Sequence, residues 1–158
     1  MLKEVKPMKR ILPLLMIVAV AALFVAINVP QAGDHANIGA DKCGKMCHKV
    51  QYTSWLATAH AKSWDTLQNS DMAKDDSCNG CHTLSAEFPG VQCESCHGPG
   101  ADYKSMSVMK DVAKATAAGL VAAPGEAFCK TCHNPDSPTY KEFNYAEAVK
   151  TGIHELKK

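Results

Sequence analysis

The chain has 158 residues, 8 Cys, 7 His and a formal net charge of +1. This length fits one domain with or without a targeting segment, and the near-neutral charge argues against a nucleic-acid-binding protein, which usually carries a strong basic excess. The hydrophobic fraction of 46% suggests an ordinary core, but 17 of the 20 residues from 11 to 30 are apolar. From Gly33 to Lys158, only 16 of 126 residues (13%) are Ile, Leu, Val or Phe, below the roughly 20% that an independently folding chain usually needs. These residues therefore either stay disordered or obtain their core from something other than their own side chains.

Residues 1–32 have the layout of an export segment, in which an apolar run follows a short basic stretch. The run is longer than the roughly 7–15 residues of a usual signal core and approaches the ~20 residues that span a membrane. We interpret residues 1–32 as a signal peptide or an N-terminal membrane anchor, with the cleaved signal favoured. A buried core helix is disfavoured because little apolar surface remains to cover it. The basic residues are Lys3, Lys6, Lys9 and Arg10.

Both interpretations place residues 33–158 outside the cytoplasm, because the basic end of such a segment stays inside. We expect a periplasmic or other extracytoplasmic protein that contacts the inner membrane only if the first segment is retained as an anchor. Residues 33–158 contain no Arg, so this part of the chain offers no forked hydrogen-bond donors for phosphate or carboxylate ligands.

All eight cysteines fall into four close pairs, and a histidine follows the second cysteine of every pair. Three pairs form C-x-x-C-H motifs, and the first pair has one extra residue between its cysteines. Disulfides or zinc sites would not require a histidine at each of these positions, whereas the haem-attachment motif does. The sequence thus predicts four c-type haems, each held by two thioether bonds and one proximal histidine. The attachment cysteines are Cys43, Cys47, Cys78, Cys81, Cys93, Cys96, Cys129 and Cys132, and the proximal iron ligands are His48, His82, His97 and His133.

Four haems in residues 33–158 correspond to about one haem for every 31 residues, and their porphyrin surface would replace the missing apolar side chains. We therefore predict a mainly α-helical domain with extensive irregular loops, a small multihaem cytochrome whose core is four covalently bound haems. Before haem attachment we expect a mostly unfolded chain, as small metal domains are unfolded without their metal.

The first motif, Cys43-Gly44-Lys45-Met46-Cys47-His48, departs from the regular spacing. One extra residue rotates the second thiol by about 100° around a helix, so the backbone has to bulge. Gly44 would permit such a bulge, and we expect haem attachment here as in the other motifs.

These motifs and their surroundings resemble the tetrahaem cytochrome c-554 family of multihaem c-type cytochromes. The likeness covers almost all of residues 38–157. It is carried by CGKMCHKVQYTSWLATAHAKSWDTL, by CNGCH followed by GVQCESCHGPG, and by a final CKTCH before a C-terminal helix with a late histidine.

Three further histidines are candidates for the sixth, distal position on iron. His60 lies in a stretch that we predict to be helical over residues 49–67, on one stripe with Leu56, Trp64 and Leu67. A histidine on the buried stripe of a haem protein is well placed to bind iron, although a core histidine is the alternative. The resemblance implies that His60 caps the haem of the last motif.

His154 follows Tyr145 in a predicted C-terminal helix that Asn144 can cap. The resemblance assigns His154 to the haem of Cys93, Cys96 and His97, with a solvent-facing histidine as the alternative. His35 lies eight residues before Cys43 and is either a third distal ligand or part of a mobile tail.

Three distal histidines cannot cap four irons, so at least one haem is open, bound by water, or capped by another group. The resemblance implies that this is the haem of the second motif. The chain also lacks the histidine that the family carries after CHGPG to cap the first haem. Met106 and Met109 are the substitutes in that segment, which we predict to be a surface helix over residues 103–123, or His35 takes over.

The sequence shows no recognisable catalytic triad, paired carboxylates or phosphate-binding loop. We therefore expect a periplasmic electron carrier between redox partner proteins, in which the haems perform the redox chemistry and the protein tunes their potentials. One alternative is an enzyme that reduces nitric oxide, another nitrogen oxide or peroxide at an open haem. Another is an oligomer, in which subunits stack into an extracellular haem filament.

Overall fold

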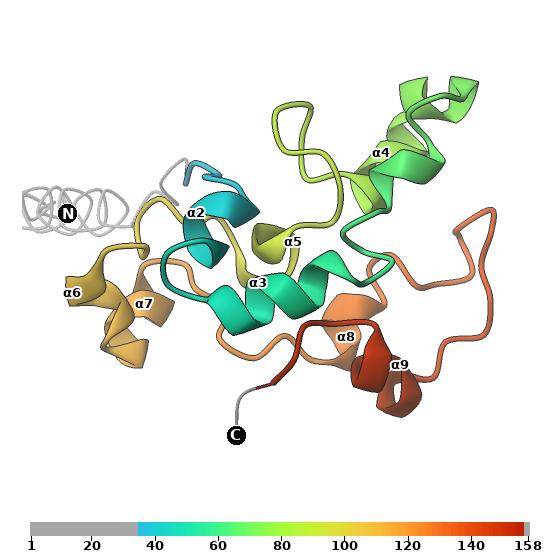
Figure 1. Cartoon of the computed structure of the whole chain (residues 1–158). Helices are drawn as coiled ribbons and strands as arrows, with labels where there is room; N and C mark the ends of the chain where they lie inside the picture. The colour runs from blue at the N-terminus through green and yellow to red at the C-terminus, as the bar shows by residue number, and fades with distance from the viewer. Residues whose placement is uncertain (1–34, 157–158) are drawn as a thin grey trace, which may run out of the picture. The chain divides into compact units, whose positions relative to one another are not determined.

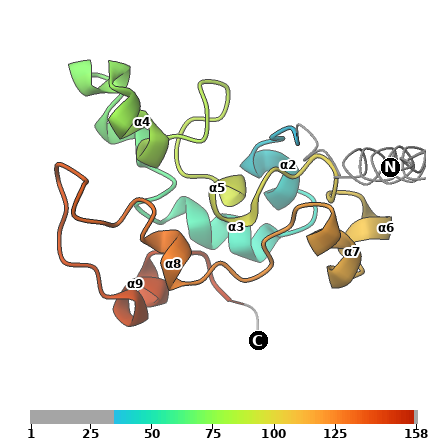
Figure 2. The same cartoon turned by 180° about the vertical axis from the view of Figure 1, so that it is seen from behind.

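The computed structural model describes residues 35–156. Eight short α-helices and two 3-10 helices are joined by irregular segments (Figures 1 and 2), and no strand longer than an isolated bridge occurs among these residues. The elements are α2 (Ala40–Gly44), α3 (Lys49–Leu56), η1 (Trp64–Thr66), η2 (Asp71–Lys74), α4 (Asp76–His82), α5 (Cys93–His97), α6 (Met106–Met109), α7 (Val112–Ala117), α8 (Glu126–Cys129) and α9 (Tyr145–Thr151). The predicted mainly α-helical fold with extensive loops is confirmed. The predicted export segment, residues 1–32, lies outside the described residues.

Local sequence signals set where several of these helices begin. The carboxylate of Asp75 accepts a hydrogen bond from the Ser77 amide at the start of α4, and that of Asp111 accepts one from the Lys114 amide at the start of α7. The Asn144 side chain caps α9 as the sequence predicts. Such caps satisfy amides that have no partner within the helix.

Two predicted helices are shorter than expected. Helix α3 ends at Leu56, where the prediction continued to residue 67, and the next residues form turns before η1. The predicted helix over residues 103–123 is divided into α6 and α7, because Asp111 lies between them and caps the second. His154 lies beyond the end of α9 rather than inside it.

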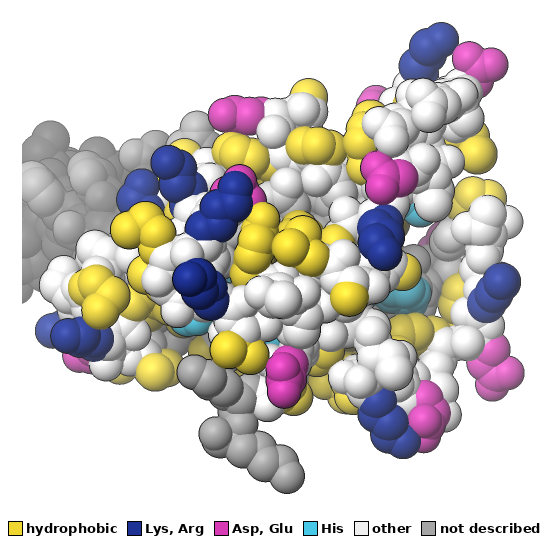
Figure 3. Space-filling view, viewed as in Figure 1, with side chains coloured by type: hydrophobic (Ala, Val, Ile, Leu, Met, Phe, Trp, Pro, Cys, Tyr) yellow, Lys and Arg dark blue, Asp and Glu magenta, His cyan; other side chains and the backbone are white. Residues whose placement is uncertain are grey.

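Very little apolar surface is buried. Ala40, Leu67, Tyr103 and Ala115 are the buried hydrophobic residues of the described part of the chain. Large apolar side chains remain exposed instead, among them Met46 (86%), Leu156 (66%) and Val112 (63%), and Figure 3 shows apolar groups scattered over the visible face. The polypeptide by itself therefore has no hydrophobic core of normal size.

The helices gather in small groups. Helix α2 packs against α3 and α5, α4 packs against η2, and α6 packs against α7. Helix α4 lies at one end of the described residues, and α6 and α7 lie at the other end, beyond α2 (Figures 1 and 2).

Candidate haem sites

Each cysteine pair sits on a short helix or tight turn that presents its two thiols together. Helix α4 contains the second motif, α5 is formed by the third, and α8 leads into the fourth. In the fourth motif the His133 amide donates a hydrogen bond to the Cys129 carbonyl at 3.0 Å, which closes an ordinary helical turn over the motif. All eight cysteines are free thiols, so a disulfide framework is absent from the described residues.

The first motif closes a wider turn that absorbs its extra residue. The His48 amide donates to the Cys43 carbonyl at 3.0 Å, five residues back rather than four. Such i→i+5 turns occur as single insertions in helices and are frequent at functional sites. The extra residue is expelled to the surface, since the Met46 side chain is 86% exposed. The first cysteine and the histidine are thus joined by the same hydrogen bond as in the fourth motif.

Gly44 has a different role from the one the sequence suggests. Its backbone does not adopt a positive φ. A Cβ on this residue would overlap the ring of Tyr52, whose hydroxyl donates to Asp41 at 2.5 Å. Glycine is needed at this position because helix α3 approaches the first motif closely here.

Thiols from different motifs meet in pairs. A hydrogen bond with the Cys93 side chain, together with burial, raises the pKa of Cys43. Burial raises the pKa of Cys81 to about 11, and a hydrogen bond with the Cys132 side chain adds to this rise. These contacts join the first motif to the third and the second motif to the fourth.

A third contact links the two pairs of motifs just described. Burial raises the pKa of Cys96, and the nearby thiols of Cys129 and Cys132 raise it further. The third and fourth motifs are therefore neighbours, and the four motifs form a spatial series in the order first, third, fourth, second.

Two of the candidate distal histidines face proximal histidines from distant parts of the chain. The rings of His60 and His133 have centroids 5.9 Å apart at 62°. The rings of His97 and His154 also have centroids 5.9 Å apart, at 26°. The structure thus brings His60 to the fourth motif and His154 to the third.

Backbone groups orient these rings. Nδ1 of His97 donates to the Val121 carbonyl at 2.7 Å, and Nδ1 of His82 donates to the Ser63 carbonyl at 3.0 Å. His60 makes a backbone hydrogen bond to Gly152, while burial lowers the pKa of His60 and of His97. Metal-binding histidines usually hold one ring nitrogen in this way, and a neutral imidazole with the other nitrogen free is the form that binds a metal.

The residues present fit a covalently bound haem. A metal–imidazole bond is about 2 Å long, so two imidazoles on opposite sides of one ion have ring centroids about 6 Å apart. Both histidine pairs have this separation. A pair of free thiols precedes each proximal histidine in the chain, and several large apolar side chains of the described residues are exposed.

Comparison with known proteins gives the family. A family described as cytochrome c554 and c-prime matches residues 42–98. Cytochrome c-554 of Nitrosomonas europaea is 31% identical over 155 residues, which cover 74% of this chain and 66% of the relative. The solved structure of reduced cytochrome c554 from the same organism matches with a TM-score of 0.57 and 26% identity, over 77% of this chain and 86% of that chain.

The chain belongs to the cytochrome c-554 family. Members of this family are c-type cytochromes, so covalently bound haem with iron is the cofactor that the family implies. The resemblance stated from the motifs is confirmed. The fold of the described residues also matches the solved cytochrome c554 structure.

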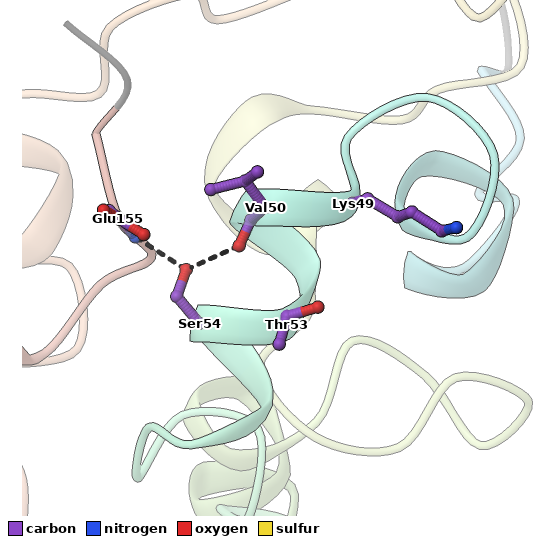
Figure 4. A pocket seen from close by; sticks show the side chains of 5 residues that line it. All are labelled: Lys49, Val50, Thr53, Ser54 and Glu155. Atoms are coloured by element: carbon purple, nitrogen blue, oxygen red, sulfur yellow. Dashed lines mark hydrogen bonds between the residues drawn. The ribbon is translucent and has the colours of Figure 1, made fainter.

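A pocket of about 590 Å³ lies beside His154, between α3 and α9. Apolar side chains in α9 and just beyond the ends of α3 and α9 line it, including Ala57, Val149 and Ile153. A smaller pocket of about 430 Å³ borders it at Lys49, Val50 and Thr53. There the Ser54 hydroxyl accepts a hydrogen bond from the Glu155 amide at 2.8 Å and donates to the Val50 carbonyl (Figure 4). This contact ties the C-terminal segment that carries His154 to α3.

The remaining predicted residues are placed differently. Nδ1 of His35 is hydrogen-bonded to the Asp102 carboxylate, and no other described imidazole stacks on the His35 ring. Met106 is 58% exposed. The sequence reading missed Asp102 and the buried Glu94, because no motif links either residue to a partner so distant in the sequence.

Proposed function

We propose that this protein is a tetrahaem electron carrier that passes electrons between redox partner proteins outside the cytoplasm. The observation that supports this proposal most directly is the spatial series of the four motifs. Cys43 lies against Cys93, Cys96 lies near Cys129 and Cys132, and Cys132 lies against Cys81. Groups attached to these thiols would be neighbours from one end of the series to the other.

Each bound haem supplies an iron that changes its oxidation state by one electron. The chain's own residues then hold and tune these groups. The cysteine pairs fix them covalently, and the proximal histidines are held by backbone carbonyls such as those of Val121 and Ser63. His60 and His154 would hold the haems of the fourth and third motifs as second ligands, which would keep small molecules from those irons.

The proposed location rests on the sequence of residues 1–32. Within residues 35–156, no helix is both long enough and apolar enough to cross a bilayer. The eight cysteines of the four motifs are free thiols, so all of them would be available for thioether bonds to haem.

Haem content and reduction test this function. The purified holoprotein is expected to contain four haems per chain by the pyridine haemochrome assay, and to be reduced fully by a small redox mediator and reoxidised by a second one. A value below three haems per chain, or a failure of every mediator to reduce the protein, would refute the proposal.

A second candidate function, reduction of a small molecule, is favoured by the surroundings of His82. No second imidazole stacks on the His82 ring among the described residues. Nδ1 of His82 contacts the Ser63 carbonyl and lies 3.5 Å from the Thr66 hydroxyl. The haem of the second motif would then have an open position. Steady consumption of nitric oxide or peroxide by the reduced protein would support this function. Binding without turnover would refute it, and electron transfer would remain as the proposed function.

A further inference from the structure

Residues 35–40, called the strap here, run alongside the third motif and are tied to it at several points. The amides of Ile38 and Gly39 donate to the Glu94 carboxylate at 2.7–3.0 Å. The Ala40 amide donates to the Gln92 side chain at 2.7 Å, and the Ala36 carbonyl accepts from the Ala101 amide at 3.2 Å. The strap is therefore a fixed part of the domain.

Glu94 is the centre of this arrangement. It is only 4% exposed, and it also accepts a hydrogen bond from the Gly100 amide at 2.6 Å. Three backbone amides thus satisfy a buried carboxylate that has no ion pair among the described residues. Burying a carboxylate costs free energy because the group loses its hydration. These amides compensate for that loss only if the strap stays in place.

The strap begins with His35, whose ring is oriented by a carboxylate. Nδ1 of His35 bonds to Asp102, in the same segment that the strap is tied to. Nε2 of His35 has no hydrogen-bond partner among residues 35–156. A carboxylate on one ring nitrogen with the other nitrogen free is the usual arrangement behind a histidine that binds a metal, because the carboxylate fixes the tautomer and makes the free nitrogen more basic.

The other imidazoles limit which iron His35 can reach. His133 and His97 already face His60 and His154, so His48 and His82 are the proximal histidines without a partner ring. His82 ends α4, at the end of the described residues remote from α6 and α7, whereas the strap leads directly into α2 (Figure 1).

Of the two motifs without a partner ring, the first is the one next to the strap in the chain, because Cys43 follows Ala40 in α2. Cys43 is in α2, and α2 packs against α5, which contains Cys93 and Glu94. Of the two methionines that could compete at this end, Met106 is 58% exposed and Met109 is half-buried.

We propose that His35 is the sixth ligand of the iron held by His48, with Asp102 as the residue that orients its ring and Glu94 as the residue that holds the strap in position. This proposal rests on the four-haem function above and assigns the ligand of one of those haems. It leaves the haem of His82 as the open one.

Carbon monoxide binding to the reduced holoprotein counts the open haems. The wild-type protein is expected to bind one CO per chain, and His35→Ala is expected to bind two. His154→Ala is the positive control and should also gain one CO. The proposal is overturned if His35→Ala binds no more CO than the wild type.

Asp102→Ala tests the orienting role separately. Loss of a carboxylate behind a metal-binding histidine typically weakens binding 10- to 100-fold, so CO should displace His35 at about 10-fold lower concentration than in the wild type. Asp65→Ala is the matched control, because the Asp65 carboxylate bonds to Gln68 and to no histidine. An equal response of the two variants would remove Asp102 from the proposal.

A measurement on the wild-type protein tests the proposal even if His35→Ala does not attach its haems and fold. Near-infrared magnetic circular dichroism distinguishes His–His from His–Met ligation, and it is expected to show three His–His haems. Two such haems, or any His–Met band, would contradict the assignment. A haem count below three per chain would instead refute the function proposed above, so the two failures are distinguishable.

Discussion

Gly44 is the residue on which the unusual first motif depends. A side chain at this position would occupy the space of the Tyr52 ring, and Tyr52 in turn bonds to Asp41 in α2. The wide turn from Cys43 to His48 is thus held from one side by a hydrogen bond and from the other by an aromatic ring. The irregular spacing is compatible with a haem site because this packing restores the relation between cysteine and histidine.

We predict that Gly44→Ala prevents haem attachment at the first motif. The added methyl group displaces Tyr52, and such overpacking usually costs about 1–3 kcal/mol. The haemochrome assay should fall from four haems to three per chain. Gly80→Ala is the matched control within the second motif, because a Cβ at Gly80 meets no atom within 4 Å. Equal haem contents in the two variants would contradict this account of Gly44.

At the scale of elements, short helices separated by turns place His60 and His154, the candidate distal histidines, beside His133 and His97. Helix α3 stops at Leu56, and the following hydroxyl groups bond to nearby carbonyls, Thr58 to that of Trp55 and Ser63 to that of His60. Such side chains compete with helical hydrogen bonds. A continuous helix through His60 would have kept the predicted stripe, whereas the turn directs His60 to His133.

The cap of α9 has a measurable role in this arrangement. Asn144→Ala removes the acceptor for the Glu147 amide, so we expect a loss of about 1 kcal/mol in the free energy of unfolding. Denaturant titration followed at the Soret band measures this change. Asn69→Ala, at an exposed position, is the control and should change the free energy by less than about 0.5 kcal/mol. A cap variant as stable as this control would show that α9 is held by other contacts.

At the scale of the whole molecule, the cofactors take the place of a hydrophobic core. Four buried apolar residues cannot compensate for the conformational entropy of the described chain. Backbone caps, the Glu94 contacts and side-chain hydrogen bonds fix local geometry, but each stabilises by only about 1 kcal/mol net. The large apolar surface that folding requires must come from the haems.

We therefore predict that the chain does not fold without haem attachment. A variant of residues 33–158 with all eight cysteines changed to alanine should lack a cooperative unfolding transition and most of the helical circular dichroism of the holoprotein. The holoprotein of the same residues serves as the control. A sharp thermal transition in the haemless variant would show that the polypeptide has a sufficient core of its own.

The sequence by itself determined the fold class, the family and the four attachment motifs. Each motif is complete within five or six consecutive residues, so its chemistry is independent of the rest of the fold. The low content of large aliphatic residues likewise indicated that the core comes from a cofactor. The assignment of His60 to the fourth motif and of His154 to the third needed the resemblance to a known family, because no local pattern specifies which motif each histidine faces.

Only the tertiary structure decided how the motifs are ordered in space and what surrounds His35. The contacts between Cys43 and Cys93, between His97 and His154, and between Glu94 and the strap join residues far apart in the sequence. Such contacts depend on where short helices end and how turns direct the chain, which small competing hydrogen bonds decide. The haem-attachment motifs are therefore determined locally in this chain, whereas the imidazole that faces His97 or His133 depends on long-range packing.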